Sequence, residues 1–496
     1  MNKILKAIES NAVSKPRQIA FRGQNHIGDV QSISYFELNK EVDMVANLFL
    51  AMQAKCIALR ADNSLDWLVI DLAAMKAKVC LVPVPTFFTD QQVEHTLAES
   101  GADVLVGDWK DKVDPITCIR NMPIYLYASG NERRYLPETS KITFTSGSTG
   151  SPKGVCLSEQ NIENVSLALA KSMEADQVCH LSLLPLSTLL ENVTSIYVPI
   201  LLGITSQIYK SETLGLTGSS QLNVKAFAEA LVQFQPNSMV LVPAILMALI
   251  QLVSREPALS DSLKFVAVGG ARVAPELIEQ AHQLGIPAYE GYGLSEFASV
   301  VSLNTENHSK AGTSGRLLPH VEAKLSEENE LLIKGNSALG YINEPFTDEW
   351  FATGDLASID SEGYVTIEGR KKNQIISGFG RNISPEWVES RAQVFLPECP
   401  MVVTGDAEAS LTAIVGAGKA IEERIERLNQ TLPDYARIKN LLIVSDMSAR
   451  KEWFTSNGRP KRKHIESWAS CIHKQYIADP LVTAKTVKTQ FEYSEI

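Results

Sequence analysis

The stretch of the sequence best suited to chemistry is a run of Gly, Ser and Thr residues that contains one lysine. Residues 142–154 read ITFTSGSTGSPKG, and the lysine is Lys153. Glycines let backbone N–H groups turn toward a bound group, hydroxyls add donors, and a lysine adds a mobile positive charge. The composition therefore predicts a loop that wraps around an anion. Taken alone, the same stretch could be an ordinary Ser/Gly loop with an incidental lysine.

The loop does not match the Walker A phosphate-binding pattern. That pattern places Ser or Thr directly after its lysine, whereas Gly154 follows Lys153 here. The general logic of a glycine-rich phosphate loop survives this mismatch, because it depends on glycines, donors and a cation rather than on one spacing.

Further motifs of similar character follow in the chain. They read YEGYGLSE (289–296), FATGDLASID (351–360) and GRKKNQIISGFGRNISPEWVE (369–389), with a weaker one at TSNGRPKRK (455–463). In this order and spacing, together with residues 143–154, they resemble the signature motifs of the adenylate-forming (AMP-binding) superfamily. Within it, the chain looks most like the long-chain fatty acyl-CoA synthetases.

The resemblance implies a two-step reaction of an AMP-forming acid–thiol ligase. A carboxylate attacks the α-phosphate of ATP, and pyrophosphate leaves from an acyl-adenylate. The thiol of CoA then takes the acyl group while AMP departs. The chemistry depends mainly on positioning and on neutralising charge at the phosphate oxygens. ATP, Mg²⁺ and CoA are the expected cofactors, and a fatty acid is the expected substrate.

The same resemblance assigns site residues one by one. Lys461, Arg459 and Glu296 are the expected catalytic residues, and Glu296 is also the expected magnesium ligand, since a carboxylate oxygen suits that ion. Tyr292 is expected to stack on adenine, Asp355 to accept from the ribose hydroxyls, and Arg370 to contact ribose or phosphate. The full set of expected nucleotide contacts is Thr145, Ser146, Gly147, Ser148, Thr149, Gly150, Lys153, Gly269, Gly270, Ala271, Glu290, Gly291, Tyr292, Gly293, Ser295, Asp355, Ile367 and Arg370.

Three positions depart from the family pattern. The catalytic lysine normally follows a glycine near the C-terminus, but Arg459 stands there and Lys461 lies two residues further on. Thr188 replaces a His or aromatic residue beside the acyl site, which leaves the acyl preference open. Gly369 replaces the usual Asp or Lys at the hinge, and glycine relaxes the dihedral limits of a rotating segment.

The elements around these motifs predict an α/β protein. Short apolar runs alternate with helical patterns over the first 370 residues, as in LKFVAVGG followed by APELIEQAHQLG (263–285), which indicates mainly parallel sheets with packed helices. Residues 238–253 are expected to form a buried strand that leads into a helix, and residues 211–221 a surface loop. We expect an N-terminal AMP- and acyl-binding domain over residues 1–369.

A smaller, mobile α/β domain is expected over residues 370–496. Its first helix is predicted to begin with Ser384 as N-cap and Pro385 at the first helical position. MVVTGDA (401–407) and LTAIVGAG (411–418) are expected to be its strands. The boundary at 369–370 is the predicted hinge.

Composition narrows the class of partner. The formal net charge of −11 disfavours general binding to nucleic acid or to anionic membranes. The sequence predicts neither a signal peptide nor a transmembrane segment. Seven scattered cysteines without metal-ligand spacing predict reduced thiols in a cytoplasmic protein.

Three functions stay open at this point. The first is an acyl-CoA ligase. The second is an acyl-adenylating enzyme that loads the phosphopantetheine of an acyl carrier protein. The third is a non-catalytic nucleotide- or acyl-binding protein, in which arginine at 459 marks the loss of catalysis. The segment from 181 to 202 is apolar apart from hydroxyls, Glu191 and Asn192, which favours a fatty or aryl acid over an amino acid.

Overall fold

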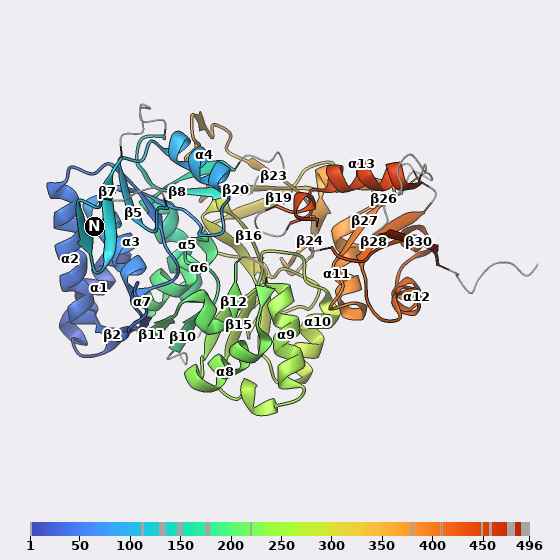
Figure 1. Cartoon of the computed structure of the whole chain (residues 1–496), viewed down its shortest axis with the longest axis horizontal. Coiled ribbons are helices and arrows are strands. Elements are labelled where there is room, and N and C mark those ends of the chain that lie inside the picture. The colour runs from blue at the N-terminus through green and yellow to red at the C-terminus, as the bar shows by residue number, and fades with distance from the viewer. Residues whose placement is uncertain are drawn as a thin grey trace, which may run out of the picture.

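The structure is a computed structural model. It describes residues 2–110, 114–127, 135–145, 152–173, 179–218, 221–377, 381–406, 408, 410–447, 450–455, 459–473 and 482–487. The chain runs from a large assembly of sheets and helices at one end of the molecule to a smaller group of elements, orange and red in Figure 1, at the other.

One nine-stranded sheet carries the strands on either side of the predicted phosphate loop. Its strands in spatial order are β22 (Glu344–Pro345), β21 (Gly340–Tyr341), β9 (Lys153–Ser158), β8 (Thr139–Thr145), β4 (Cys80–Pro83), β3 (Cys56–Arg60), β5 (Val104–Gly107), β7 (Met122–Leu126) and β6 (Thr117–Ile119). The four central strands β8, β4, β3 and β5 run parallel, and antiparallel strands flank them. The parallel centre is buried, as such sheets require.

A second nine-stranded sheet carries the motif at 289–296. Its strands in spatial order are β18 (Arg316–Leu317), β17 (Ser299–Leu303), β16 (Ala288–Leu294), β15 (Phe265–Val268), β14 (Ser238–Leu241), β10 (Cys179–Ser182), β11 (Thr205–Ile208), β1 (Ile19–Gln24) and β2 (Val30–Ser34). The strands from β16 to β1 are parallel, while β17 and β2 are antiparallel to their neighbours. Clusters of buried apolar residues fill the space around these sheets.

The remaining strands form smaller sheets. One antiparallel sheet has the order β19 (Glu322–Leu325), β20 (Glu330–Lys334), β23 (Phe351–Ile359) and β24 (Val365–Arg370). The C-terminal sheet has the order β27 (Met401–Thr404), β28 (Leu411–Gly416), β29 (Ile438–Val444) and β30 (Val482–Thr486). Two-stranded ladders pair β12 (Leu216–Thr217) with β13 (Gln221–Leu222) and β25 (Ile375–Ile376) with β26 (Asn382–Ile383).

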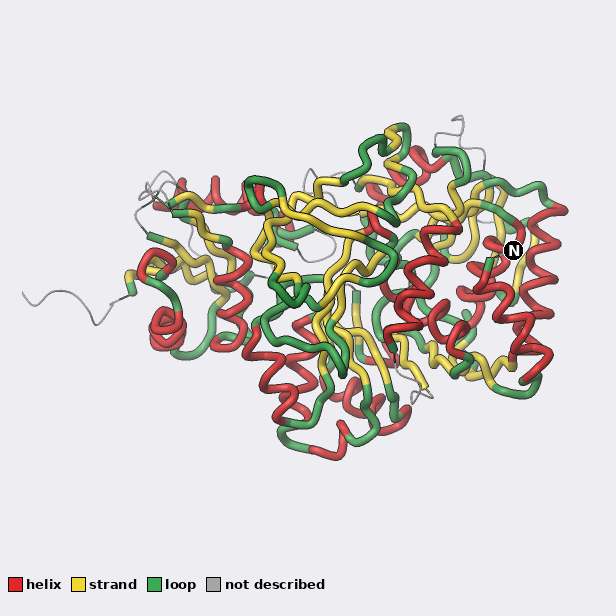
Figure 2. The backbone as a smooth tube through the Cα atoms, turned by 180° about the vertical axis from the view of Figure 1, so that it is seen from behind, coloured by secondary structure: helices red, strands yellow, loops and turns green. Residues whose placement is uncertain are grey.

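The helices lie mainly on the outside of the sheets (Figure 2). They are α1 (Lys3–Ser14), α2 (Tyr35–Ala51), α3 (Leu65–Ala77), α4 (Asp90–Ser100), α5 (Glu159–Ser172), α6 (Leu189–Asn192), α7 (Val198–Leu202), α8 (Val224–Phe234), α9 (Pro243–Val253), α10 (Pro275–Gln283), α11 (Pro385–Phe395), α12 (Ile421–Thr431) and α13 (Arg462–His473). None of the helices in the described ranges combines the length and the apolar composition needed to cross a bilayer.

The predicted fold class is confirmed: the protein has a large α/β part with mainly parallel sheets and a smaller C-terminal α/β part. Strand β14 leads directly into α9, as expected for residues 238–253. Helix α11 begins at Pro385, and the hydroxyl of Ser384 accepts a hydrogen bond from the backbone N–H of Trp387. The position of the domain boundary and its function as a hinge stay predictions.

One local expectation is wrong. Residues 211–221 do not form a plain surface loop, because a 3-10 turn (Ser211–Leu214) leads into β12, which pairs with β13. The reason is burial: Leu214 and Leu216 are buried among the apolar residues of the neighbouring cluster. The Gly, Ser and Thr content of this stretch concealed two core positions.

A buried polar network holds β8, the strand that enters the phosphate loop. The ammonium group of Lys141 donates to Asp71 Oδ1 and to the hydroxyl of Tyr197, both at 2.6 Å, and also to Asn192. The hydroxyl of Tyr197 donates to Asp71 Oδ2 at 2.6 Å. Burial lowers the pKa of Lys141, and the Asp71 carboxylate opposes this shift. The network therefore links β8 to α3, α6 and the turn before α7 through a charge pair that water does not reach.

Replacing one partner of the Lys141–Asp71 pair should lower the free energy of unfolding. We expect Lys141→Met to cost about 3–5 kcal/mol, because Asp71 would keep a buried, uncompensated charge. The double variant Lys141→Met, Asp71→Leu should be less destabilised than either single variant. Thermal and urea unfolding measure the difference. Lys225→Met, which removes the exposed Lys225–Glu229 pair, is the matched control and should leave the unfolding midpoint unchanged. Equal midpoints for Lys141→Met and the parent would contradict the prediction.

Candidate active site

The two ends of the predicted phosphate loop are held together by β8 and β9. Thr145 and Lys153 are direct partners in this antiparallel ladder, and the Thr145 hydroxyl donates to the Lys153 carbonyl oxygen at 3.4 Å. The ladder therefore holds the two described ends of the predicted loop side by side. The predicted contacts Ser146, Gly147, Ser148, Thr149 and Gly150 lie outside the described residues.

Tyr341 connects Lys153 with Glu296. The ammonium group of Lys153 lies over the Tyr341 ring, 4.4 Å from its centroid, and the Tyr341 hydroxyl donates to Glu296 Oε1 at 2.8 Å. Strand β21 places Tyr341 here by pairing with β9, in which Val155 is its partner. The predicted phosphate-binding lysine and the predicted metal ligand therefore share one aromatic side chain. Tyr341 lies outside the motifs recognised in the sequence, so its place in the site was not predicted.

The surroundings of Glu296 fit a magnesium ion that a substrate also coordinates. Its carboxylate is half-buried, and among the described residues only one of its two oxygens has a hydrogen-bond partner. No cluster of three or more His, Cys, Asp or Glu side chains suited to a metal occurs within the described ranges. Magnesium commonly binds through one or two carboxylates together with substrate phosphates and water, so one carboxylate near a phosphate loop is an adequate protein contribution.

The motif at 289–296 forms β16 and the turn after it. Gly293 allows the close approach of β16 and β17, because a Cβ at this position would lie 1.7 Å from the Ser299 carbonyl oxygen. The next turn is a 3-10 helix, Ser295–Phe297, which carries Ser295 and Glu296. Gly291, paired with Leu303, keeps the preceding part of the strand in the sheet. The glycines here are therefore required by the hairpin itself.

Glu290 is buried at the end of the parallel part of β16. Its carboxylate accepts a hydrogen bond from the Ser314 hydroxyl at 3.1 Å. Burial raises the pKa of Glu290 to about 7, and the Ser314 hydrogen bond and the charge of Arg272 oppose the shift. A carboxyl group with this pKa can exchange a proton near neutral pH, in contrast to an exposed glutamate.

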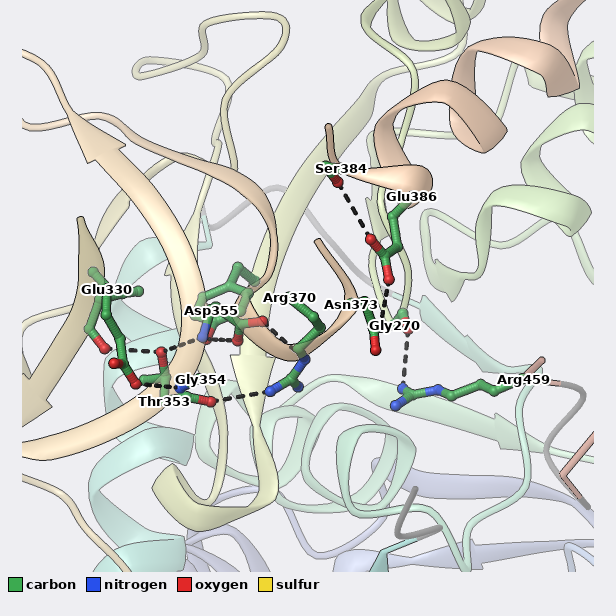
Figure 3. A network of polar contacts seen from close by, with 12 residues as sticks. Gly270, Glu330, Thr353, Gly354, Asp355, Arg370, Asn373, Ser384, Glu386 and Arg459 are labelled. Carbon is green, nitrogen blue, oxygen red and sulfur yellow. Dashed lines mark hydrogen bonds and ion pairs between the residues drawn. The ribbon is translucent and has the colours of Figure 1, made fainter. Parts of the chain in front are cut away.

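A polar network around Asp355 forms the centre of the candidate site (Figure 3). The Tyr292 hydroxyl donates to Asp355 Oδ2 at 2.6 Å, and Arg370 Nε lies 2.9 Å from Asp355 Oδ1. Arg370 also donates to the Thr353 carbonyl oxygen at 3.0 Å. Burial raises the pKa of Asp355, while Arg370 and the Tyr292 hydroxyl act in the opposite direction. Both oxygens of the predicted ribose acceptor are thus oriented before any ligand binds.

Strands β23 and β24 position this network. They pair in antiparallel register with Asp355 opposite Arg370 and Ala357 opposite Ile367. Ile367 and Tyr292 both pack against the apolar cluster under the four-stranded sheet. The backbone N–H of Asp355 donates to the Thr353 hydroxyl at 3.1 Å, which fixes the turn that carries the carboxylate.

The segment after β15 brings a residue from far along the chain into the site. Gly269, Gly270 and Ala271 follow β15, and Gly270 has a φ of +82°. Arg459 Nη2 donates to the Gly270 carbonyl oxygen at 3.2 Å, and its side chain extends toward Gly270 in Figure 3. Arg272, one residue beyond Ala271, donates to the Glu368 carbonyl oxygen at 2.5 Å.

Lys461 is placed differently from Arg459. It is exposed at the start of α13, and its backbone N–H donates to the Trp453 carbonyl oxygen at 2.7 Å. The structure therefore brings Arg459, rather than Lys461, to the segment that follows β15. The role of either residue in catalysis stays a proposal.

The described site thus combines several distant parts of the chain. The described contacts link Lys153 to Glu296, Tyr292 to Asp355 and Arg370, and Arg459 to Gly270. Sequence reasoning missed Tyr341, Arg272 and Thr353. Arg272 directly follows the predicted Gly269–Ala271 segment, so its proximity could have been anticipated, whereas Thr353 contributes mainly through backbone geometry.

Comparison with known proteins finds a matching family model and similar ligases. Residues 8–342, about two thirds of the chain, match the family model described as "AMP-binding enzyme". A long-chain-fatty-acid–CoA ligase, FadD15 of Mycobacterium bovis, is 34% identical over 165 residues, and the match covers 32% of this chain but only 28% of that relative. The 2-succinylbenzoate–CoA ligase of Staphylococcus epidermidis is 26% identical over 473 residues, which cover 88% of this chain and 93% of the relative.

A solved structure shares the fold. The o-succinylbenzoate CoA synthetase MenE of Bacillus subtilis, in complex with the acyl-adenylate intermediate OSB-AMP, superposes with a TM-score of 0.75 at 20% identity, covering 93% of this chain and 97% of that one. At this identity the likeness concerns the fold. Because the family model matches about two thirds of its residues, the chain belongs to the AMP-binding enzyme family.

Proposed function

We propose that the protein is an AMP-forming acid–CoA ligase. It activates a carboxylic acid with ATP and transfers the acyl group to the thiol of CoA. The observation that carries the proposal is the convergence of the loop ends Thr145 and Lys153, the carboxylate of Glu296 and the Tyr292–Asp355–Arg370 network in one described site. Membership in the AMP-binding family and the similarity to CoA ligases over most of the chain support it.

Each group has a role that its chemistry suits. Lys153 and the loop hydroxyls hold the β- and γ-phosphates, and Asp355 accepts hydrogen bonds from the ribose hydroxyls. Tyr292 contributes its ring to the adenine side while its hydroxyl orients Asp355. Glu296 holds a magnesium ion, which supplies charge neutralisation at the phosphate oxygens when bound.

The reaction takes place in two substitution steps. The acid's carboxylate oxygen attacks the α-phosphorus, and the bond to the bridging oxygen breaks, so that pyrophosphate leaves. The thiolate sulfur of CoA then attacks the acyl carbon, and the bond to the AMP oxygen breaks. Arg459 would balance the negative charge that gathers on the α-phosphate in the first step, since a guanidinium remains protonated at all relevant pH values.

The acid is proposed to be a fatty acid. The segment 181–202, which is described throughout, contains one ionisable carboxylate, Glu191, and this side chain is fully buried. Its Oε1 accepts from the Leu183 backbone N–H at 2.9 Å and from the Ser195 hydroxyl at 2.7 Å. Asn192 belongs to the Lys141 network. Glu191 Oε2 has no hydrogen-bond partner among the described residues, but both side chains are buried and neither is exposed to the amine of an amino acid. The apolar remainder suits an apolar chain.

An aryl acid is the second candidate. The relative that matches most of the chain acts on 2-succinylbenzoate, as its name states, and an aromatic ring also suits an apolar site. A carrier-protein phosphopantetheine is the alternative acceptor to CoA. No disulfide joins any of the seven cysteines, all of which lie in the described ranges, and this supports our further proposal that the enzyme works in the reducing cytoplasm.

Acid-dependent exchange of labelled pyrophosphate into ATP tests the function. We expect exchange with one class of acid in a panel of fatty, aryl and amino acids, followed by thioester formation with CoA. Exchange that depends on an aryl acid would select the second candidate, and transfer only to a carrier protein would replace CoA as acceptor. If no acid supports exchange, the protein is a binding protein and the proposed enzymatic activity is wrong.

Glu296→Gln should raise the magnesium concentration needed for half-maximal adenylation by roughly tenfold, because a neutral amide replaces an ionised ligand oxygen. Magnesium titration of the exchange reaction measures this effect. Glu306→Gln, in an exposed loop, is the control and should titrate like the parent. Superimposable titration curves for Glu296→Gln and the parent would rule out this ligand.

Arg459→Ala should slow adenylation at least about tenfold, or roughly 1.4 kcal/mol of barrier. The reason is that the guanidinium is the positive charge that the structure brings to Gly270. Lys461→Ala should be affected less, since within the described residues no hydrogen bond or ion pair joins the Lys461 side chain to the segment after β15, whereas Arg459 donates to Gly270. Pyrophosphate exchange measures both variants. A larger loss for Lys461→Ala would transfer the role to Lys461.

A further inference from the structure

One ion pair joins the C-terminal part of the molecule to the large N-terminal part beside the candidate site. Arg391 of α11 pairs through Nη2 with Oε1 of Glu276, which lies in the first turn of α10. The side chains of Arg391 and Glu276 are 25% and 39% exposed. The other carboxylate oxygen of Glu276 is buried and has no hydrogen-bond partner among the described residues. Arg391 therefore compensates a charge that is only partly solvated.

The ion pair lies close in the chain to the segment that Arg459 contacts. Helix α10 begins four residues after Ala271, and the Gly270 carbonyl oxygen accepts from Arg459. The two contacts therefore fall within one short segment of the large part, at Gly270 and Glu276. Both partners come from residues beyond the predicted hinge at 369–370, so they fix the same two parts of the molecule relative to each other.

A second ion pair links α11 to the segment that contains Arg459. Arg462, three residues after Arg459, donates through Nη1 and Nη2 to the two carboxylate oxygens of Glu389 at 2.8 and 2.5 Å. Glu389 lies on α11, two residues before Arg391. Because a bidentate Arg–carboxylate pair fixes both distance and orientation, a displacement of α11 would carry Arg459 with it.

The predicted hinge is also tightly packed in this arrangement. Gly369 has a φ of +155°, and a Cβ at this position would lie 2.3 Å from the Ser384 hydroxyl oxygen. The start of α11 thus rests directly on the residue before Arg370. Helix α11 is therefore held at two points, by Gly369 at its N-cap Ser384 and by Glu276 at Arg391.

We propose that Glu276 and Arg391 are positioning residues for adenylation. Their ion pair holds α11 against α10 and thereby keeps Arg459 at the Gly270 carbonyl, where the charge of the α-phosphate would gather. This inference rests on the proposed function. Partly exposed ion pairs are weak, so the contact can break when the C-terminal part turns away before thiol transfer.

Charge reversal tests the pair. Glu276→Arg and Arg391→Glu should each lower acid-dependent pyrophosphate exchange by about tenfold, because like charges would then face each other across the contact. The double variant should recover to within about twofold of the parent. Transfer of the acyl group from supplied acyl-adenylate to CoA should be unchanged in all three. Glu279→Gln, on the exposed side of the same helix, is the matched control and should behave like the parent.

A readout independent of catalysis separates this inference from the proposed function. Limited proteolysis near residue 370 should be faster in both single variants and return to the parent rate in the double variant. If the parent supports no exchange with any acid, the proposed function fails, while the proteolysis pattern still decides whether the ion pair holds the two parts together. Parent-like exchange and proteolysis in the single variants, or a double variant that fails to recover, would overturn the inference. Equal losses of adenylation and transfer would indicate a general structural role and would overturn it as well.

Discussion

The carboxylate of Asp355 is the interaction on which the candidate site depends. It receives the Tyr292 hydroxyl from β16 of a nine-stranded sheet and the Arg370 guanidinium from the end of β24 in a four-stranded sheet. Because the carboxylate is buried, its charge is costly unless these partners compensate it. The same contacts therefore orient the predicted ribose-binding carboxylate, join two sheets and hold Arg370, at which the C-terminal part is predicted to begin.

The phosphate side of the site depends on a different constraint, which lies deeper in the molecule. Strand β8 ends at Thr145, and its buried Lys141 is held by Asp71, Tyr197 and Asn192. A buried charge with several fixed partners leaves the strand little freedom to shift, since each displacement would leave a polar group unpaired. Asn192 and Glu191 are adjacent in the chain. Through the hydrogen bond from Lys141 to Asn192, the segment proposed to line the acid site is therefore attached to the strand that enters the predicted phosphate loop.

Under the proposed function, these two supports allow one chain to combine a rigid nucleotide site with a cation that moves. Tyr292 and Asp355 lie on β16 and β23, and Glu296 lies in the 3-10 helix directly after β16, so all three belong to the large part of the molecule. Arg459 reaches the site from the C-terminal part, and the contacts seen for it are a single hydrogen bond to a carbonyl oxygen and, through α11, a partly exposed ion pair. Buried contacts are costly to break and persist, whereas exposed polar contacts are weak and can break and re-form.

The fold class and strongly patterned elements such as α9 and α11 could be predicted from the amino-acid sequence alone. The motifs at 142–154, 289–296 and 351–360 were also recognisable in it. Local chemistry dictates these features: apolar runs must be buried, Ser384 caps a helix, and glycine at 293 permits a close approach of two strands. The burial of Leu214 and Leu216 was not readable, because a stretch rich in glycine and hydroxyls resembles a loop until its neighbours are known. Tertiary structure alone decided that Tyr341 joins Lys153 to Glu296, that Arg459 rather than Lys461 reaches Gly270, and that Glu276 meets Arg391. Each of these contacts joins residues far apart in the chain, and only the packing of whole sheets and helices sets such distances.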